Sequence, residues 1–334
     1  MNTQRFLAFY TPRAFWVDAP ANLENIGSPA FAKSMGEICY ACVFEKFTLK
    51  IARDGLLMLS VGKLDRKEST PLPNIDQTIK LWRNYLEHIN SLYLLLDSAT
   101  IRCSSASFFN LNEITLRDAF TIHLDENDEF LGMQTLTGSF AGVLQHDRLP
   151  SQANTPQLLN RLMLRSTLPS SVIHHAVTRY KRAATEPELL RLLNSLAKGL
   201  SEYKQGNYET AVVLAWFLIE FHLNAIWEKF LETENKTMPD GVLRFGKDRE
   251  RYLTKELTIS MIVQHLEFAG LLDWETFRKV DATRKVRNRL AHRMPATASR
   301  DEASIALHLA HEFIENQSHI DIDLNSSLSI MSGI

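Results

Sequence analysis

The sequence predicts an α+β domain followed by an all-α helical bundle. Over residues 1–150, short apolar segments alternate with turn residues, which is typical of antiparallel strands. Beyond residue 156, apolar residues recur at helical spacing along nearly the whole chain. The stretch 150–156 between them is rich in Pro, Ser, Gln, Asn and Thr, and we expect a domain boundary there.

The N-terminal domain, residues 1–150, is expected to contain two hairpins and one long helix. The predicted hairpin strands occupy residues 46–52 with 56–61, and residues 114–124 with 130–136. Asp54-Gly55 is a typical tight turn for the first hairpin, and an acidic turn at 125–128 joins the second. Residues 76–97 have apolar side chains at helical spacing. The domain has no glycine-rich phosphate loop and no nucleophile elbow, so its residues alone leave its role unknown.

The C-terminal part is expected to be connector helices over 151–185, a bundle over 186–320 and a loose tail over 321–334. The predicted helices are 157–168 and 170–183 in the connector, then 186–204, 208–232, 253–268, 274–293 and one that follows Ser299. Residues 208–232 are apolar on nearly every side of the helix, which favours a central buried position. Ser299 and Glu302 have the spacing of a capping box at the start of the last helix.

Basic residues are concentrated in one predicted helix, although the formal net charge of the chain is only −2. Between residues 278 and 293 the only acidic residue is Asp281. The basic residues are Arg278, Lys279, Arg284, Lys285, Arg287, Arg289 and Arg293. A local basic strip on a near-neutral protein favours a polyanionic partner at one place. A solvated helix face paired with acidic side chains from elsewhere is the alternative.

The cysteines and the apolar segments set further limits. Cys39 and Cys42 have the C-x-x-C spacing of redox pairs and zinc half-sites, and His88 and Cys103 could complete a ligand set. We interpret both as small buried residues beside a strand, and we expect no metal and no cofactor. Residues 1–20 do not resemble a signal peptide, and no stretch approaches the length of a membrane span. We therefore expect a reduced, soluble, cytoplasmic protein.

Arg287-Asn288-Arg289-Leu290-Ala291-His292 is the most informative motif. Arginine offers phosphate a fixed cation with forked donors, and histidine exchanges protons near neutral pH. The segment resembles the Arg-X4–6-His signature of the HEPN superfamily, whose active members are metal-independent endoribonucleases. The motif also follows a long apolar helix and precedes one more amphipathic helix, which is the order that the family pattern requires.

The resemblance implies an endoribonuclease of defence or toxin type that cuts RNA by attack of the 2′-hydroxyl. It assigns proton transfer to His292, phosphate binding to Arg287, and the orientation of His292 or of the phosphate to Asn288. Arg284, Arg289 and Arg293 would contact the RNA backbone without regard to sequence. Glu220, in the buried helix, would support the site by pairing with Arg287 or His222; its alternative place is the rim of the bundle.

The resemblance also bears on partners. HEPN ribonucleases commonly act as dimers with two motifs facing each other, so we expect a homodimer or a higher oligomer. A regulatory or antitoxin partner is expected from the family's habits, and a membrane partner is not. The same habits imply that the N-terminal domain, residues 1–150, is a sensor or a partner-docking module. Some family toxins carry a tyrosine two residues after the histidine, where a partner enzyme attaches nucleotides. Met294 occupies that position here, which argues against regulation of this kind.

Other interpretations stay open at this stage. Arg83 with His88 fits the same motif, although no buried helix precedes it, and Arg117 with His123 also fits. Arg287 and His292 could instead stabilise the C-terminal end of their helix, where cations oppose the dipole. The main alternative function is a non-catalytic helical scaffold, which dimerises or binds RNA without cutting it.

Overall fold

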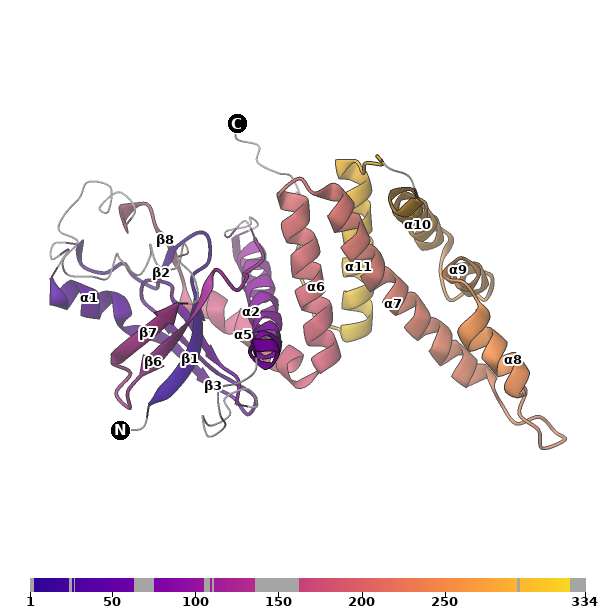
Figure 1. Cartoon of the computed structure of the whole chain (residues 1–334), viewed down its shortest axis with the longest axis horizontal. Helices are drawn as coiled ribbons and strands as arrows, with labels where there is room; N and C mark the ends of the chain where they lie inside the picture. The colour runs from indigo at the N-terminus through magenta and orange to yellow at the C-terminus, as the bar shows by residue number, and fades with distance from the viewer. Residues whose placement is uncertain are drawn as a thin grey trace. The chain divides into compact units, whose positions relative to one another are not determined.

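The computed structural model describes residues 3–23, 26, 28–62, 75–104, 109, 111–135, 162–292 and 295–324. Two compact units make up the chain (Figure 1). Unit 1 comprises Met1–Ala197 and Asp323–Ile334, and unit 2 comprises Lys198–Ile322. The boundary between the units falls within a helix, some distance beyond the segment 150–156 at which the hydrophobic period changes.

Unit 1 is built on a six-stranded antiparallel sheet with the strand order β3-β4-β5-β1-β6-β7. The strands are β1 (Gln4–Phe9), β3 (Ile38–Val43), β4 (Thr48–Ala52), β5 (Leu57–Ser60), β6 (Ala119–Leu124) and β7 (Phe130–Thr135). A second, parallel pair joins β2 (Phe15–Val17) to β8 (Ser166–Leu168). An α+β fold for the N-terminal part is therefore confirmed.

Both predicted hairpins form. Gly55 turns the chain between β4 and β5 with φ +82°, and a Cβ there would lie 2.7 Å from the carbonyl oxygen of Phe15. Only glycine suits this turn, both for its positive φ and for the close approach. In the β6–β7 turn, one carboxylate oxygen of Asp125 accepts hydrogen bonds from the backbone N–H groups of Asn127 and Glu129, each 2.8 Å. The backbone of each turn is therefore determined by a residue within it, Gly55 in the first turn and Asp125 in the second.

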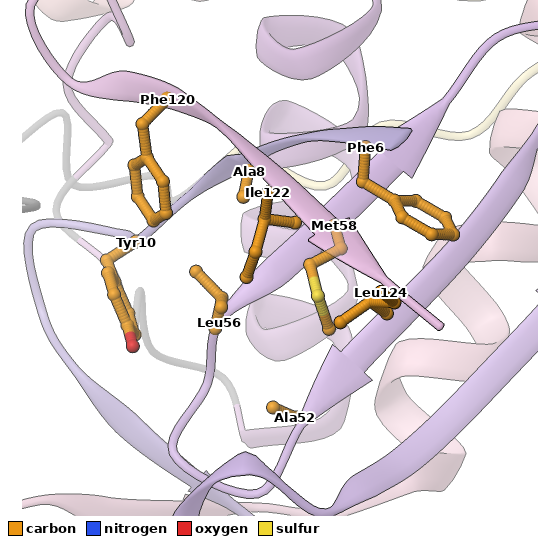
Figure 2. Packing of buried hydrophobic residues seen from close by; sticks show 9 residues of the cluster. All are labelled: Phe6, Ala8, Tyr10, Ala52, Leu56, Met58, Phe120, Ile122 and Leu124. Carbon is orange, nitrogen blue, oxygen red and sulfur yellow. The ribbon is translucent and has the colours of Figure 1, made fainter. Parts of the chain in front are cut away.

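The core of unit 1 lies on both faces of the sheet. Figure 2 shows side chains of β1, β5 and β6 that pack together, among them Phe6, Met58 and Ile122, each with an exposed fraction of 1%. Within the described residues, the helices that lie wholly in this unit are α1 (Pro29–Gly36), α2 (Ile75–Ser104) and α5 (Ser170–Thr185), with α2 packed against α5. A partly buried hydrogen bond of 2.7 Å joins Nδ1 of His88 in α2 to the hydroxyl of Tyr180 in α5.

Unit 2 is helical. Helix α6 (Pro187–Lys204) spans the boundary between the units, and α7 (Tyr208–Glu234) is the central helix of unit 2. The helices that follow are α8 (Lys247–Arg251), a π-helical turn (Tyr252–Glu256), α9 (Ile259–Phe268), α10 (Trp274–His292) and α11 (Arg300–Ser318). α7 packs against α9, α10 and α11, and Ile219 and Leu223 in its middle are fully buried. The central position predicted for this helix is confirmed.

In the C-terminal part of the chain, three segments differ from the sequence-based expectation. Residues 166–168, placed in a connector helix, form strand β8 instead, because they pair with β2; residues 157–161 lie outside the described part of the chain. The helix expected over 253–268 begins only at Ile259, after the π-helical turn. The start of the expected tail is fixed, because Ile322 is buried and the backbone N–H of Asp323 donates to Ser98 Oγ at 2.8 Å.

Helix α7 is long and apolar enough to cross a membrane, by length and composition alone, with a mean hydropathy of 1.5 over its most apolar window. The expectation that no stretch approaches a membrane span therefore needs correction. Half of that window is buried inside the fold, as in the core helix of a soluble protein. Its apolar composition follows from its central place among α9, α10 and α11.

The His88–Tyr180 contact predicts a dependence of stability on pH. Burial lowers the pKa of His88 from 6.5 to about 4. Between these values the unfolded chain binds more protons at this site, so the contribution of His88 to the free energy of unfolding should be nearly constant above pH 6.5. This contribution should fall by roughly 3 kcal/mol as the pH drops from 6.5 to 4. Urea denaturation of the wild type and of His88→Gln across this range measures the effect.

Gln keeps a hydrogen-bonding group near Tyr180 but does not titrate, so the variant should lose this part of the slope. His123→Gln, at a half-buried position in β6, is the matched control and should retain it. Equal slopes for the wild type and His88→Gln would contradict the assignment of the effect to His88.

Candidate functional site

The predicted site residues lie on α10, which begins with a carboxylate cap. Asp273 accepts hydrogen bonds from the backbone N–H of Thr276 at 2.9 Å and from its hydroxyl at 2.6 Å. The bond from the Thr276 side chain is the main reason that the pKa of Asp273 is lowered. Val280, Thr283 and Val286 form the buried face of the helix. These contacts fix which side of α10 faces the bundle and which side faces solvent.

Arg287, Asn288 and His292 occupy the last two turns of α10. Nη1 of Arg287 donates to Oδ1 of Asn288 at 3.2 Å, and both side chains are half-buried. His292 is exposed at the last residue of the helix and makes no hydrogen bond or ion pair within the described part of the chain. Residues four apart on a helix lie about 40° apart, so Asn288 and His292 share a face, whereas Arg287 is rotated by about 140° from His292.

Four basic residues of α10 form ion pairs with acidic side chains. Asp281 pairs with Arg284 at 2.7 Å and with Lys285 at 2.6 Å. Burial of Asp281 alone would raise its pKa, but the bonds from Lys285 and Arg284 outweigh this and lower it. Lys279 pairs with Glu275 at 3.2 Å and lies 3.9 Å from Glu312. These cations are therefore paired with acidic side chains, as in the alternative interpretation of the basic strip. Binding of RNA by them stays a prediction.

Arg289, near the end of α10, forms an ion pair with Glu302 of α11. Its Nη2 donates to both carboxylate oxygens of Glu302, each at 2.9 Å, and to the carbonyl oxygen of Thr297 at 3.0 Å. Glu302 is also the third residue of α11 and forms a capping box with the N-cap residue Ser299. The capping box predicted from the sequence is confirmed, whereas its link to Arg289 was not foreseen. Arg289 thus has a structural role, and RNA binding by it stays a prediction.

The support expected from Glu220 does not form within the described part of the chain. Glu220 is half-buried on α7 and makes no hydrogen bond or ion pair there, with Arg287, with His222 or with any other described residue. His222 Nδ1 instead bonds to the carbonyl oxygen of Leu218 at 2.9 Å, and burial lowers its pKa. The rim position is therefore the better description of Glu220. Arg293 and Met294 lie outside the described residues.

The competing motifs fare differently. His88 donates to or accepts from the hydroxyl of Tyr180 in the packing of α2 on α5, which is a structural role, while Arg83 is exposed.

Cys39, Cys42 and Cys103 are free thiols, and Cys39 and Cys42 are partly exposed, so the expectation that they are buried is wrong. Among the described residues, no group of three or more His, Cys, Asp or Glu side chains is placed to hold a metal ion.

Comparison with known proteins gives no match among family models, curated proteins or solved structures. The case for a function therefore depends on the residues of the chain and their geometry.

The Arg289–Glu302 pair predicts a measurable contribution to stability. Burial alone would raise the pKa of Glu302, but hydrogen bonds from Ser299 and Arg289 lower it. The stabilisation is therefore present above the unfolded-state value of about 4.3 and is lost as the pH falls through the folded-state pKa. Glu302→Gln should reduce the free energy of unfolding at pH 7 by about 1 kcal/mol, as measured by urea denaturation.

The difference between Glu302→Gln and the wild type should shrink when the same measurement is made near pH 3.5. Glu312→Gln is the matched control on the same helix, because the nearest cation to Glu312 is Lys279 at 3.9 Å. A similar loss in both variants would mean that the capping pair has no special role.

Proposed function

We propose that this chain is a metal-independent endoribonuclease of the HEPN type, acting in defence or as a toxin. One observation carries the proposal: the C-terminal end of α10 presents an exposed imidazole, His292, with Asn288 on the same face and Arg287 bonded to Asn288. A general base and a phosphate-binding cation on adjacent turns are what RNA cleavage without a metal requires. A helical unit whose central helix packs against the helix of the motif agrees with the family pattern.

In the proposed reaction, His292 takes the proton of the RNA 2′-hydroxyl. The 2′-oxygen attacks the adjacent phosphorus, and the bond from phosphorus to the 5′-oxygen breaks. The departing oxygen takes up a proton from a second imidazole or from water, which leaves a 2′,3′-cyclic phosphate and a 5′-hydroxyl. Arg287 stabilises the negative charge on the non-bridging oxygens, and Asn288 holds the arginine in place. DNA lacks the 2′-hydroxyl and should resist.

The proposal includes a second copy of the chain. On one helix, Arg287 and His292 are rotated by about 140° and separated by about 7.5 Å along the axis, which does not favour joint contact with one phosphate. Two copies that face each other across α10 would instead bring an arginine and a histidine from different chains to the same phosphate. Exposed aromatic side chains of unit 2 support association, since Phe217, Phe268 and Trp274 have exposed fractions of 57%, 90% and 62%.

The same exposed apolar residues favour the second candidate, a scaffold that dimerises or binds RNA without cutting it. Pairing of Arg284 and Arg289 with acidic side chains also fits a structural helix. The two candidates differ in one respect, which is whether Arg287 and His292 act on a bound phosphate.

Catalysis is tested with purified protein and labelled single-stranded RNA in EDTA. Wild type should release fragments that end in a 2′,3′-cyclic phosphate, while His292→Ala and Arg287→Ala should each lower the rate by at least about 100-fold. The matched control is Lys285→Ala, because Lys285 is an exposed cation on the same helix and should change the rate much less. Equal cutting by all variants would contradict the proposal. RNA binding without any cutting would favour the scaffold.

The two-copy site predicts complementation between inactive variants. When Arg287→Ala and His292→Ala chains are co-expressed, about half of the dimers contain one chain of each kind. Each mixed dimer then has one intact arginine and one intact histidine on different chains, so about a quarter of the wild-type rate should return. Size-exclusion chromatography with light scattering should show a dimer for every variant. No recovery of cutting in confirmed mixed dimers would show that the site does not combine groups from two chains.

A further inference from the structure

Unit 1 contains an open cleft of about 890 Å³ between α1 and the β6–β7 hairpin. The buried side chains Met58, Ile122 and Leu124 line it, and Figure 2 shows them on the same side of the sheet. Small residues of α1, such as Ala30 and Ala32, also line the cleft. A concave site with an apolar floor and a few polar groups at its rim has the composition typical of ligand sites. Its size is sufficient for one or two large side chains.

The apolar surface of the cleft extends to β7 at the edge of the sheet. Phe130 pairs with Leu124, and Met133 pairs with Ile122, so both lie on the face that lines the cleft. Their exposed fractions are 52% and 38%. Edge strands of soluble proteins are usually protected by charged side chains, because unpaired backbone groups invite another strand. Exposed Phe and Met side chains here instead offer an apolar contact surface.

Among the described residues that line the cleft, Glu37, Asp128 and Glu129 have carboxylates and Lys33 has an ammonium group. Each carboxylate forms an ion pair: Glu37 with Arg53, Asp128 with Lys50 and Glu129 with Lys33. Glu37 and Glu129 are well exposed, with side-chain fractions of 57% and 63%, and their bonds to Arg53 and Lys33 leave oxygens free to accept. These exposed carboxylate oxygens disfavour a phosphate or another anion and favour a cationic group beside the apolar floor.

We propose that the cleft binds an extended peptide segment of a partner protein, in which a large apolar side chain lies next to lysine or arginine. The apolar side chain would enter between Met58, Leu124 and Phe130, and the cationic group would contact Glu129 and Glu37. This is a docking site in unit 1 and does not depend on the ribonuclease activity proposed for α10. It gives the N-terminal domain a partner of defined chemistry.

The test is the selection of binders from a random twelve-residue peptide library displayed on phage, with the full-length chain as target. Enriched peptides should share an aromatic or large aliphatic residue beside lysine or arginine. Synthetic, fluorescently labelled copies then give dissociation constants by fluorescence anisotropy. Glu129→Lys and Phe130→Ser, both at exposed positions, should each weaken binding at least tenfold.

Val43→Ser is the matched control, because Val43 has an exposed fraction of 80% on β3, the strand at the opposite edge of the same sheet. It should leave the dissociation constant within twofold of the wild type, and circular dichroism should show that all three variants are folded. Absence of enriched peptides, an acidic consensus, or equal binding by Glu129→Lys, Phe130→Ser and the wild type would each overturn the proposal.

Discussion

The candidate site depends on one ion pair, the contact between Arg289 and Glu302. The guanidinium holds both carboxylate oxygens, and the same carboxylate accepts the backbone N–H of Ser299, so one side chain closes the start of α11 and the end of α10. One nitrogen of Arg289, Nη2, contacts both oxygens and also donates to the carbonyl oxygen of Thr297. Together with the buried face of α10, formed by Val280, Thr283 and Val286, this contact holds the end of the helix at which His292 lies.

The distribution of charge on α10 has a second consequence. In the sequence the helix is strongly basic, but Asp281 engages Arg284 and Lys285 on its own face. The positive potential near the motif is therefore more local than the count of arginines implies. Any RNA that binds must either compete with Asp281 for these cations or contact the few that have no acidic neighbour. Affinity from general electrostatic attraction should then be modest, and the proposed site depends more on the geometry of Arg287 and His292.

Turns and caps that are determined by neighbouring residues could be predicted from the sequence. Elements that are determined by contacts between distant segments could not. The hairpin at Asp54-Gly55 and the cap at Ser299 are confirmed because turn and cap residues determine their own backbone. Strand β8 was mistaken for helix because its state is set by pairing with β2, about 150 residues earlier in the chain. Helix α1 was not foreseen, although Ser28 caps it and Pro29 follows at its first position.

The candidate site shows the same division. The motif residues and their helix are visible in the sequence, but Glu302 as the partner of Arg289 is not, because the two lie on different helices. The expected pairing of Glu220 failed because the direction in which a side chain leaves a helix depends on packing. The cleft in unit 1 was also beyond sequence reasoning, since α1, β5 and the β6–β7 hairpin are far apart along the chain.

The buried imidazole of His222 lowers the stability of unit 2. Its Nε2 atom is buried without a hydrogen-bond partner among the described residues, beside the ring of Phe313. A buried polar atom in this condition typically costs about 1–3 kcal/mol. An apolar side chain of similar volume would remove that cost, so the retained nitrogen marks a place where the helices of the bundle are held together less tightly than their hydrophobic contacts permit.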